Sequence, residues 1–429
     1  MKGKSILCVV ILAVAFCPAQ TSLNGKVFVG YQGWFRCPDD GSPQHTWNHW
    51  SRGAPTADTI AVDLYPDTSE LPASSVCPIT TESVHGRPAR FFSSYPAATV
   101  ETHLSWMEQY GIDGLLLQRF TDAIPGQRGE GDVVLKNVRN AAEKHHRNFL
   151  IEYDVSGDTP EGLFSRLKED WRYLSNDLHL TSDPAYFHVD GKPVVSIWGL
   201  GFNDGYHLDN AALALQIISW FKEQAGAVVI GGVPAGWGTL TADSVSDPAW
   251  ARVYAALDIV QPWTVGRYSS MKDADAWKAT HLEPDMQRTT ANNQQYMPVI
   301  FPGFSWHNLN RDKSGNEIPR LGGNFLWKQA YNAKAAHAKF VKIAMFDEVN
   351  EGTAIFKAVS RRQDAPTPGY WLTLDADGQD LPSDWYLRIT RQISCMFKDE
   401  IPSALSLPRS VAVDGPIPQT LRQKNRVCP

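Results

Sequence analysis

Three acidic side chains lie close together in the stretch AMFDEVNEGT, which occupies residues 344–353. They are Asp347, Glu348 and Glu351, and they directly follow an apolar run. Carboxyl groups held near one another in a partly desolvated cleft raise one another's pKa, so one stays protonated while its neighbour stays ionised. Such a pair can act as acid and base in cleaving a glycosidic bond, which makes Glu348 and Glu351 the candidate catalytic pair. The alternative is a solvated loop in which Asp347 or Asn350 caps a following helix.

Aromatic and polar side chains recur just after the other apolar runs of the chain, which holds 15 tryptophans in all. Sugar rings stack on aromatic faces while their hydroxyls take polar contacts, so this mixture is typical of a carbohydrate cleft. Large aromatics also plug the ends of barrels, which is the alternative explanation for the tryptophans. The candidate substrate-binding residues in this set are Trp34, Gln118, Arg119, Glu152, Trp198, Trp263 and Trp306, with Gln32, Asp154, Trp237, Gln261 and Phe304 beside them.

The elements that must position these side chains follow a repeated pattern, in which a short apolar run precedes an amphipathic stretch of ten or more residues. This alternation predicts a parallel sheet covered by helices on its outside. In such folds the functional groups sit at the carboxyl ends of the strands. We therefore expect one α/β domain, a (β/α)8 TIM-type barrel with elaborated loops, over residues 25–400. The expected strands are residues 27–31, 114–117, 149–153, 194–198, 228–232, 258–261, 299–301 and 341–346.

Two segments depart from the repeat. Residues 36–95 are dense in Pro, Ser, Asp and Thr and exceed an ordinary strand-to-helix connection, so they form either an elaborated active-site loop, which we favour, or an inserted subdomain. Near the other end, a helix is expected from about residue 384 to residue 397. A Pro-rich tail, residues 401–429, follows it and is expected to wrap the barrel or to be partly disordered.

The N-terminus has the pattern of an export signal over residues 1–19, because Lys2 and Lys4 precede an apolar run that ends near Cys17. The expected location is therefore secreted or periplasmic. A lipoprotein anchor at Cys17 is the rival interpretation, which the bulky Phe16 beside it disfavours. No later stretch is long and apolar enough to predict a transmembrane segment.

Four cysteines remain once this segment is removed, an even number in an exported chain. They allow three pairings, of which we favour Cys37 with Cys77, because both lie in the loop-rich N-terminal part. Cys395, in an apolar helix, is equally well explained as a small buried side chain; the fourth is Cys428.

The charge balance excludes one class of partner, because a net charge of −6 and a pI near 6.1 do not predict a basic surface for nucleic acid. His45 and His49 raise the question of a metal, but no third ligand lies near them in the sequence, so we expect none. The sequence indicates no cofactor, and it leaves the oligomeric state open.

The glutamate motif resembles that of glycoside hydrolase family 99 and the related family 71-like group, which includes endo-α-mannosidases and bacterial xylosidase/arabinosidase-like proteins. The residues 347–353, DEVNEGT, keep both glutamates three apart and the Gly-Thr that follows them. The stretches YQGWF at 31–35 and IEY at 151–153 resemble the family's turns after its first and third strands. The resemblance spans about residues 27–356.

This resemblance implies a retaining mechanism in which one carboxylate deprotonates the sugar's own 2-hydroxyl while the other protonates the leaving oxygen. Glu348 would assist the 2-hydroxyl, Glu351 would be the acid and then the base, and Glu152 would contact the sugar at the reaction centre. The residues that would shape the cleft are Tyr31, Trp34, Trp263 and Tyr268. This chemistry needs no metal.

The chain also departs from the family's motif. Asp347 replaces an Asn, Val349-Asn350 replaces Trp-His, and no Pro follows Glu152. We therefore expect an oligosaccharide or polysaccharide substrate with α-linkages, mannan-like or related. A catalytically silent sugar-binding barrel is the alternative. An esterase is disfavoured, because the chain has no Gly-x-Ser-x-Gly motif.

Overall fold

A computed structural model describes residues 22–412, 415–417 and 428. The predicted export signal and Cys17 lie outside these residues, as does most of the tail after Ala412. No helix in the described part of the chain is long and apolar enough to cross a membrane.

One large sheet forms the centre of the structure, and all the pairings along its main path are parallel. Its order is β10-β9-β8-β7-β5-β4-β1-β12-β11. The ends of this path are neighbours in the chain, since only Met297 and Pro298 separate β10 from β11. The strands are β1 (Val27–Tyr31), β4 (Gly114–Phe120), β5 (Asn148–Asp154), β7 (Lys192–Trp198), β8 (Val228–Val233), β9 (Ile259–Pro262), β10 (Gln295–Tyr296), β11 (Val299–Ile300) and β12 (Val341–Ile343), with β6 (His188–Val189) antiparallel to β7.

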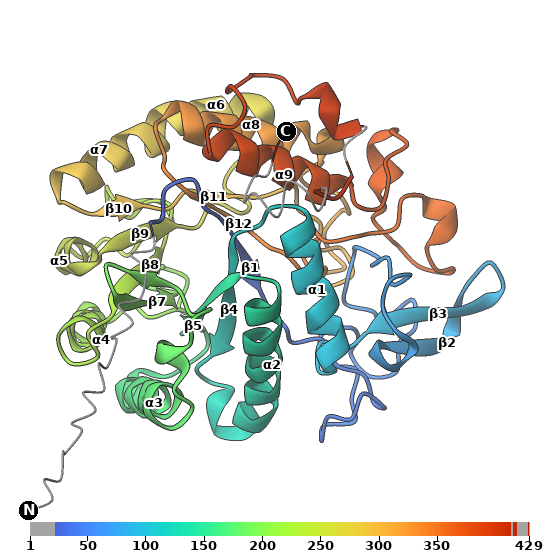
Figure 1. Ribbon diagram of the computed structural model, residues 1–429, viewed down its shortest axis with the longest axis horizontal. Helices are drawn as coiled ribbons and strands as arrows, with labels where there is room; N and C mark the ends of the chain where they lie inside the picture. The colour runs from blue at the N-terminus through green and yellow to red at the C-terminus, as the bar shows by residue number, and fades with distance from the viewer. Residues whose placement is uncertain (1–21, 413–414, 418–427, 429) are drawn as a thin grey trace, which may run out of the picture.

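Helices surround this sheet, as Figure 1 shows. Their apolar faces cover the outer side of the strands, and side chains also fill the inner side, so β1 is buried along its whole length. Each of the eight predicted strands overlaps an observed one, and the predicted helix near residue 384 is observed as α9. The helices are α1 (Ala97–Gln109), α2 (Ile124–Lys144), α3 (Pro160–Arg172), α4 (Ala211–Glu223), α5 (Ala249–Ala256), α6 (Met271–Trp277), α7 (Glu283–Ala291), α8 (Asn324–Ala335) and α9 (Trp385–Phe397).

The segment 36–95 contains an antiparallel hairpin of β2 (Val76–Val84) and β3 (Arg87–Phe92), which lies beside α1 at the edge of the molecule (Figure 1). The prediction of a loop missed this hairpin. The disulfide Cys37–Cys77, which was predicted, joins β2 to the chain just after β1. A second disulfide, Cys395–Cys428, fastens the end of the chain to α9, so Cys395 is not an isolated thiol.

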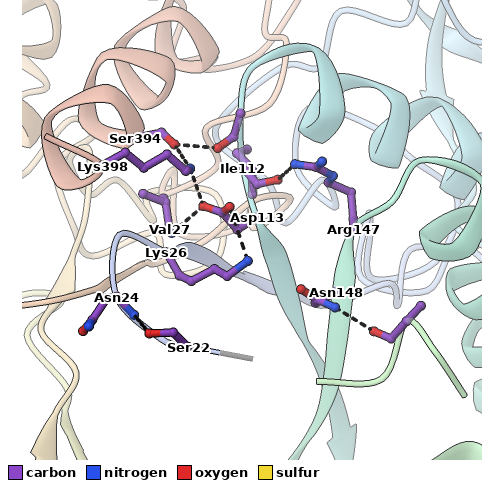
Figure 2. A network of polar contacts seen from close by, with 12 residues as sticks. Ser22, Asn24, Lys26, Val27, Ile112, Asp113, Arg147, Asn148, Ser394 and Lys398 are labelled. Atoms are coloured by element: carbon purple, nitrogen blue, oxygen red, sulfur yellow. Dashed lines mark hydrogen bonds and ion pairs between the residues drawn. The ribbon is translucent and has the colours of Figure 1, made fainter. Parts of the chain in front are cut away.

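A polar network ties the chain together at the amino-terminal ends of β1 and β4 (Figure 2). The Asp113 carboxylate accepts a hydrogen bond from the Val27 N–H at 2.9 Å and forms an ion pair with Lys398 at 2.8 Å. Lys26 lies 3.7 Å from the same carboxylate. Burial alone would raise the pKa of Asp113, but the two lysines outweigh it and hold this pKa below its usual range. The network therefore links the first strand, the second strand of the barrel and the last helix.

Asp113→Asn is expected to lower the free energy of unfolding at neutral pH by about 1–3 kcal/mol, because two lysines lose their buried anion. A depressed pKa stabilises the fold only while the group is ionised in the unfolded chain, so the deficit should shrink as pH falls below about 4. Urea denaturation at several pH values measures this. Asp39→Asn, at an exposed aspartate, is the matched control. An equal deficit at all pH values would contradict the electrostatic explanation.

Candidate active site

The glutamate motif forms a tight loop at the carboxyl end of β12, closed at its base by backbone hydrogen bonds. The Met345 N–H donates to the Thr353 carbonyl at 3.2 Å, and the Ile355 N–H donates to the Met345 carbonyl at 3.1 Å. Gly352 has a φ of +62°, and a Cβ there would lie 3.1 Å from Ser305, so the turn after Glu351 requires glycine. The loop therefore holds both glutamates in a fixed arrangement.

Asp347 anchors this loop to the end of β1. Its two carboxylate oxygens accept the N–H groups of Gln32 and Gly33 at 2.8 and 2.9 Å. Burial raises the pKa of Asp347 to about 6, although both N–H groups oppose that rise. The alternative in which Asp347 or Asn350 caps a helix is wrong, because the next helical element of the described chain is the 3-10 turn Arg362–Asp364.

The Glu348 carboxylate is buried and accepts two hydrogen bonds. Gln32 Nε2 donates to one oxygen at 2.8 Å, and the Asn350 N–H donates to the other at 3.1 Å. Burial raises the pKa of Glu348 well above its usual value, and the neighbouring charges of Glu351 and Asp347 add to this rise. No arginine or lysine of the described residues forms an ion pair with this carboxylate, so no such pair lowers its pKa.

Glu351 is half-buried, and its carboxyl group has no hydrogen bond or ion pair with any side chain among the described residues. Burial raises its pKa to about 7. Burial and the neighbouring acids raise the pKa of Glu348 even though the two N–H donors oppose that rise, whereas no donor reaches Glu351. Two carboxyl groups with raised pKa values in one site can share a single proton near neutral pH.

The side chains of Arg320 and Asn350 join the loop to other parts of the chain. Arg320 Nη2 donates to the carbonyls of Gly352 and Ala354 at 2.6 and 2.7 Å. Asn350 Nδ2 donates to the carbonyls of His49 and Ala61 at 2.8 and 2.9 Å, which joins the motif to the segment 36–95. That segment therefore helps to position the glutamates.

A buried ion pair lies among the strands beneath the loop. Glu152 on β5 and Lys342 on β12 are both 0% exposed, and Lys342 Nζ lies 2.7 and 2.9 Å from the two carboxylate oxygens. Ser196, Gln118 and Gln261 also donate to Glu152, at 2.8, 3.2 and 3.3 Å. The Glu152 side chain is 0% exposed. The sugar contact that the resemblance implies for it stays a prediction.

A cavity of about 360 Å³ opens beside the glutamate loop, at the carboxyl ends of β1 and β4 and over the start of α2. Trp34, Gln118 and Arg119 line it, as predicted for cleft residues, and so does Gln32. Neither glutamate is among its lining residues. Gln32 is the link, since it borders the cavity and donates to Glu348.

Trp34 cannot act as an open stacking platform in this arrangement. The His49 ring stacks on the Trp34 ring with a centroid distance of 3.7 Å, and the Phe120 ring stacks on Trp34 with a centroid distance of 5.2 Å. His49 also has its pKa lowered to about 3 by burial, so it is neutral. His45 bonds instead to the Pro38 carbonyl through Nδ1 at 2.9 Å.

The other predicted aromatic residues fall into separate groups. Trp198 and Trp263 pack edge to face at 5.3 Å, and the Trp263 ring lies 5.9 Å from Lys342 Nζ. Trp306 packs against Phe304 in the loop after β11. These three tryptophans are partly exposed.

Tyr31 and Tyr268 lie away from the cavity, which corrects the expectation that both shape the cleft. The Tyr31 hydroxyl is 2.9 Å from His103 Nδ1 of α1, and the Tyr268 hydroxyl donates to Gln329 of α8 at 2.9 Å. Both side chains therefore pack between the sheet and its helices.

Arg119 is held in place by two aspartates, Asp170 at 2.6 Å and Asp132 at 3.0 Å. Lys342, Arg36 and Arg320 were not among the residues predicted for the site. A lysine inside a fully apolar strand was a signal for Lys342, since such a charge is buried only with a partner. No local pattern pointed to the two arginines.

No family model matches this sequence, and no curated protein matches it. Two structures of the GH99 endo-α-mannosidase from Bacteroides thetaiotaomicron are similar to this chain, with TM-scores of 0.62 and 0.61 and identities of 17% and 18%. These alignments cover 88% of this chain and 99% of theirs. A glycoside hydrolase-like protein has a TM-score of 0.54 at 14% identity, over 87% of this chain and 94% of its own. The resemblance to family 99 is thus confirmed for the fold, an α/β barrel type of architecture.

Proposed function

We propose that this protein is a glycoside hydrolase that cleaves α-linked glycans, mannan-like or related. The observation that carries the proposal is the pair of the buried Glu348 and the half-buried Glu351 at the carboxyl end of β12, with no arginine or lysine partner in the described chain. Structural neighbours described as a GH99 endo-α-mannosidase and a glycoside hydrolase-like protein support the same class.

In the proposed mechanism Glu348 is the base and Glu351 the acid. The Glu348 carboxylate takes the proton of the sugar's 2-hydroxyl, and that oxygen attacks the anomeric carbon. The bond to the leaving oxygen breaks, and this oxygen takes the proton of Glu351. Water then attacks the anomeric carbon and gives a proton to Glu351. The bond between this carbon and the 2-oxygen breaks, and the 2-oxygen regains its proton from Glu348. The anomeric configuration is retained.

The test is cleavage of a panel of α-mannans, α-glucans and mixed bacterial polysaccharides by the purified chain, followed by chromatography of the products. Release of oligosaccharides with retained configuration is the expected result. Binding of these glycans without any cleavage would contradict the proposal and would favour a silent sugar-binding barrel.

The activity is expected to depend on pH with a maximum near neutrality. Above about pH 7, the value of the raised Glu351 pKa, the acid loses its proton and kcat/KM falls. At low pH the base becomes protonated and kcat/KM falls again. Initial rates from pH 4 to 10, at substrate concentrations below KM, would measure both limbs. A rate that stays constant up to pH 9 would contradict the assignment of a carboxylic acid as proton donor.

We also infer that residues 295–300 act as one interrupted strand, which would close the sheet into an eight-stranded barrel. The support is that β10 pairs with β9 while β11 pairs with β12. An experimental structure with an open sheet edge at these residues would contradict this closure.

We propose that the protein is exported. The two disulfides support this, because such bonds persist mainly in oxidising compartments. The N-terminal sequence of protein recovered outside the cytoplasm is expected to begin after residue 19. Recovery of the full-length reduced chain from the cytoplasm alone would contradict export.

A further inference from the structure

The cavity beside the glutamate loop contains a buried guanidinium that forms no ion pair with a described residue, although Asp40 and Glu130 act on its charge from a longer distance. Arg36 lines this cavity and is 5% exposed. Its Nη1 donates to the carbonyls of Gly33 and Phe35, both at 2.9 Å, while its buried Nε has no hydrogen-bond partner. None of the ion pairs of the described residues includes it. A buried cation is costly unless an anion accompanies it, so this position favours a negatively charged ligand.

Two other arginines that line the same cavity are already neutralised. Arg119 forms ion pairs with Asp170 and Asp132, and Arg128 lies 3.4 Å from Asp170. Arg36 therefore differs from these two arginines in having no ion-pair partner among the described residues, and an anion entering the cavity would be directed to it.

The remaining charges limit what this anion can be. Asp122 and Glu130 line the same cavity, and neither forms an ion pair with Arg36. Two carboxylates at the wall would repel a polyanion, so the cavity suits a ligand with one negative group among neutral hydroxyls.

An exposed aromatic ring borders the cavity as well. Tyr206, in the loop after β7, is 60% exposed and is a lining residue. Such a ring offers the face on which a sugar can stack, which Trp34 does not, because its own neighbours cover it.

We propose that this cavity is a subsite for a sugar carrying one anionic group, a carboxylate or a sulfate, and that Arg36 binds that group. The nature of the ligand as a sugar rests on the proposed function. Gln32 borders the subsite and bonds to Glu348, so the anionic sugar would lie next to the reacting one. The glycan that this protein cleaves is then acidic.

The test measures the binding of four sugars to the full purified chain by ligand-observed NMR titration. The sugars are D-glucuronate, its neutral methyl ester, D-glucose 6-sulfate and D-glucose. The wild-type chain should bind glucuronate about tenfold or more tightly than the methyl ester, because a charge-assisted hydrogen bond is lost in the ester. This preference should disappear in Arg36→Gln and partly return in Arg36→Lys. Binding of the sulfate as well would show that the anion, rather than the carboxyl group, is recognised.

Arg147→Gln is the matched control. Arg147 also donates to main-chain carbonyls, those of Ile112 and His145, but it lies in the network of Figure 2 at the opposite ends of the strands. It controls for the loss of a bridging arginine, and it should leave the preference for glucuronate unchanged.

Equal affinity of the wild-type chain for glucuronate and its methyl ester would overturn the proposal, whether or not the Arg36 variants fold. A preference that survives in folded Arg36→Gln would overturn it too. These results are separable from the proposed function. Cleavage of neutral glycans without anion preference would leave the hydrolase intact, and Arg36-dependent binding without cleavage would leave the subsite intact.

Discussion

Glu351→Gln and Glu348→Gln are each expected to lower kcat/KM on a natural glycan by about 10²–10⁴-fold, the usual contribution of a general acid or base. The reason is that glutamine neither gives nor takes the required proton, while it preserves the size of the side chain. Purified variants and the wild-type chain should be compared on whichever glycan the wild-type chain cleaves. Glu143→Gln, at an exposed glutamate of α2, is the control and should retain full activity.

The two variants can be told apart by the leaving group. An aryl glycoside with an acidic phenol leaves without needing a proton, so Glu351→Gln should recover much of the rate of the first step on such a substrate. Glu348→Gln should not recover this rate, because no base takes the proton from the 2-hydroxyl of the substrate. Recovery in the Glu348 variant alone would reverse the assigned roles, and full activity in either variant on natural glycans would remove it from the mechanism.

Lys342→Met is expected to destabilise the fold by about 3–5 kcal/mol, the typical effect of removing one partner from a buried ion pair. Both Lys342 and Glu152 are 0% exposed, so the remaining carboxylate has no water to solvate it. Equilibrium unfolding in urea, monitored by tryptophan fluorescence, measures the difference. Lys339→Met, at an exposed lysine before β12, is the control and should change stability little.

A double variant tests whether the cost comes from the unpaired charge. Glu152→Gln combined with Lys342→Met removes both charges and should recover part of the lost stability, since the two effects are coupled. If the double variant were less stable than the sum of the single losses, the ion pair would not explain the effect.

The strands could be predicted because each is apolar on both faces, which makes a short unbroken hydrophobic run. The same property hid which side chains face the cavity. In an alternating strand the polar residues mark one face, whereas in β1 both faces are apolar and the direction of Tyr31 cannot be read from the sequence. Its ring in fact packs toward α1. The β2–β3 hairpin was missed because β2 alternates irregularly, with Thr80 and Thr81 both exposed and the charged Glu82 buried.

The candidate pair could be predicted because Glu348 and Glu351 are neighbours in the chain. The contacts that set their chemistry are not local. Gln32 reaches Glu348 from 316 positions away, and Arg320 and Asn350 bind main-chain carbonyls that no sequence pattern specifies. Arg36 carries no signal in the sequence for the same reason, since only the fold shows that it lines a cavity without an ion-pair partner among the described residues.

The attachment of Asn350 to the segment 36–95 has a consequence for how the motif can be exchanged. Asn350 and Val349 are two of the positions where the motif departs from the family 99 pattern that it resembles, and both contact that segment. The Asn350 amide bonds to its carbonyls, and the Val349 carbonyl accepts the N–H groups of Asp63 and Leu64. Exchanging Val349-Asn350 alone for Trp-His would break these contacts. Exchanging the segment alone would leave the Asn350 amide without its acceptors. The motif and the segment 36–95 therefore form one structural unit, so a change in either is expected to need a matching change in the other.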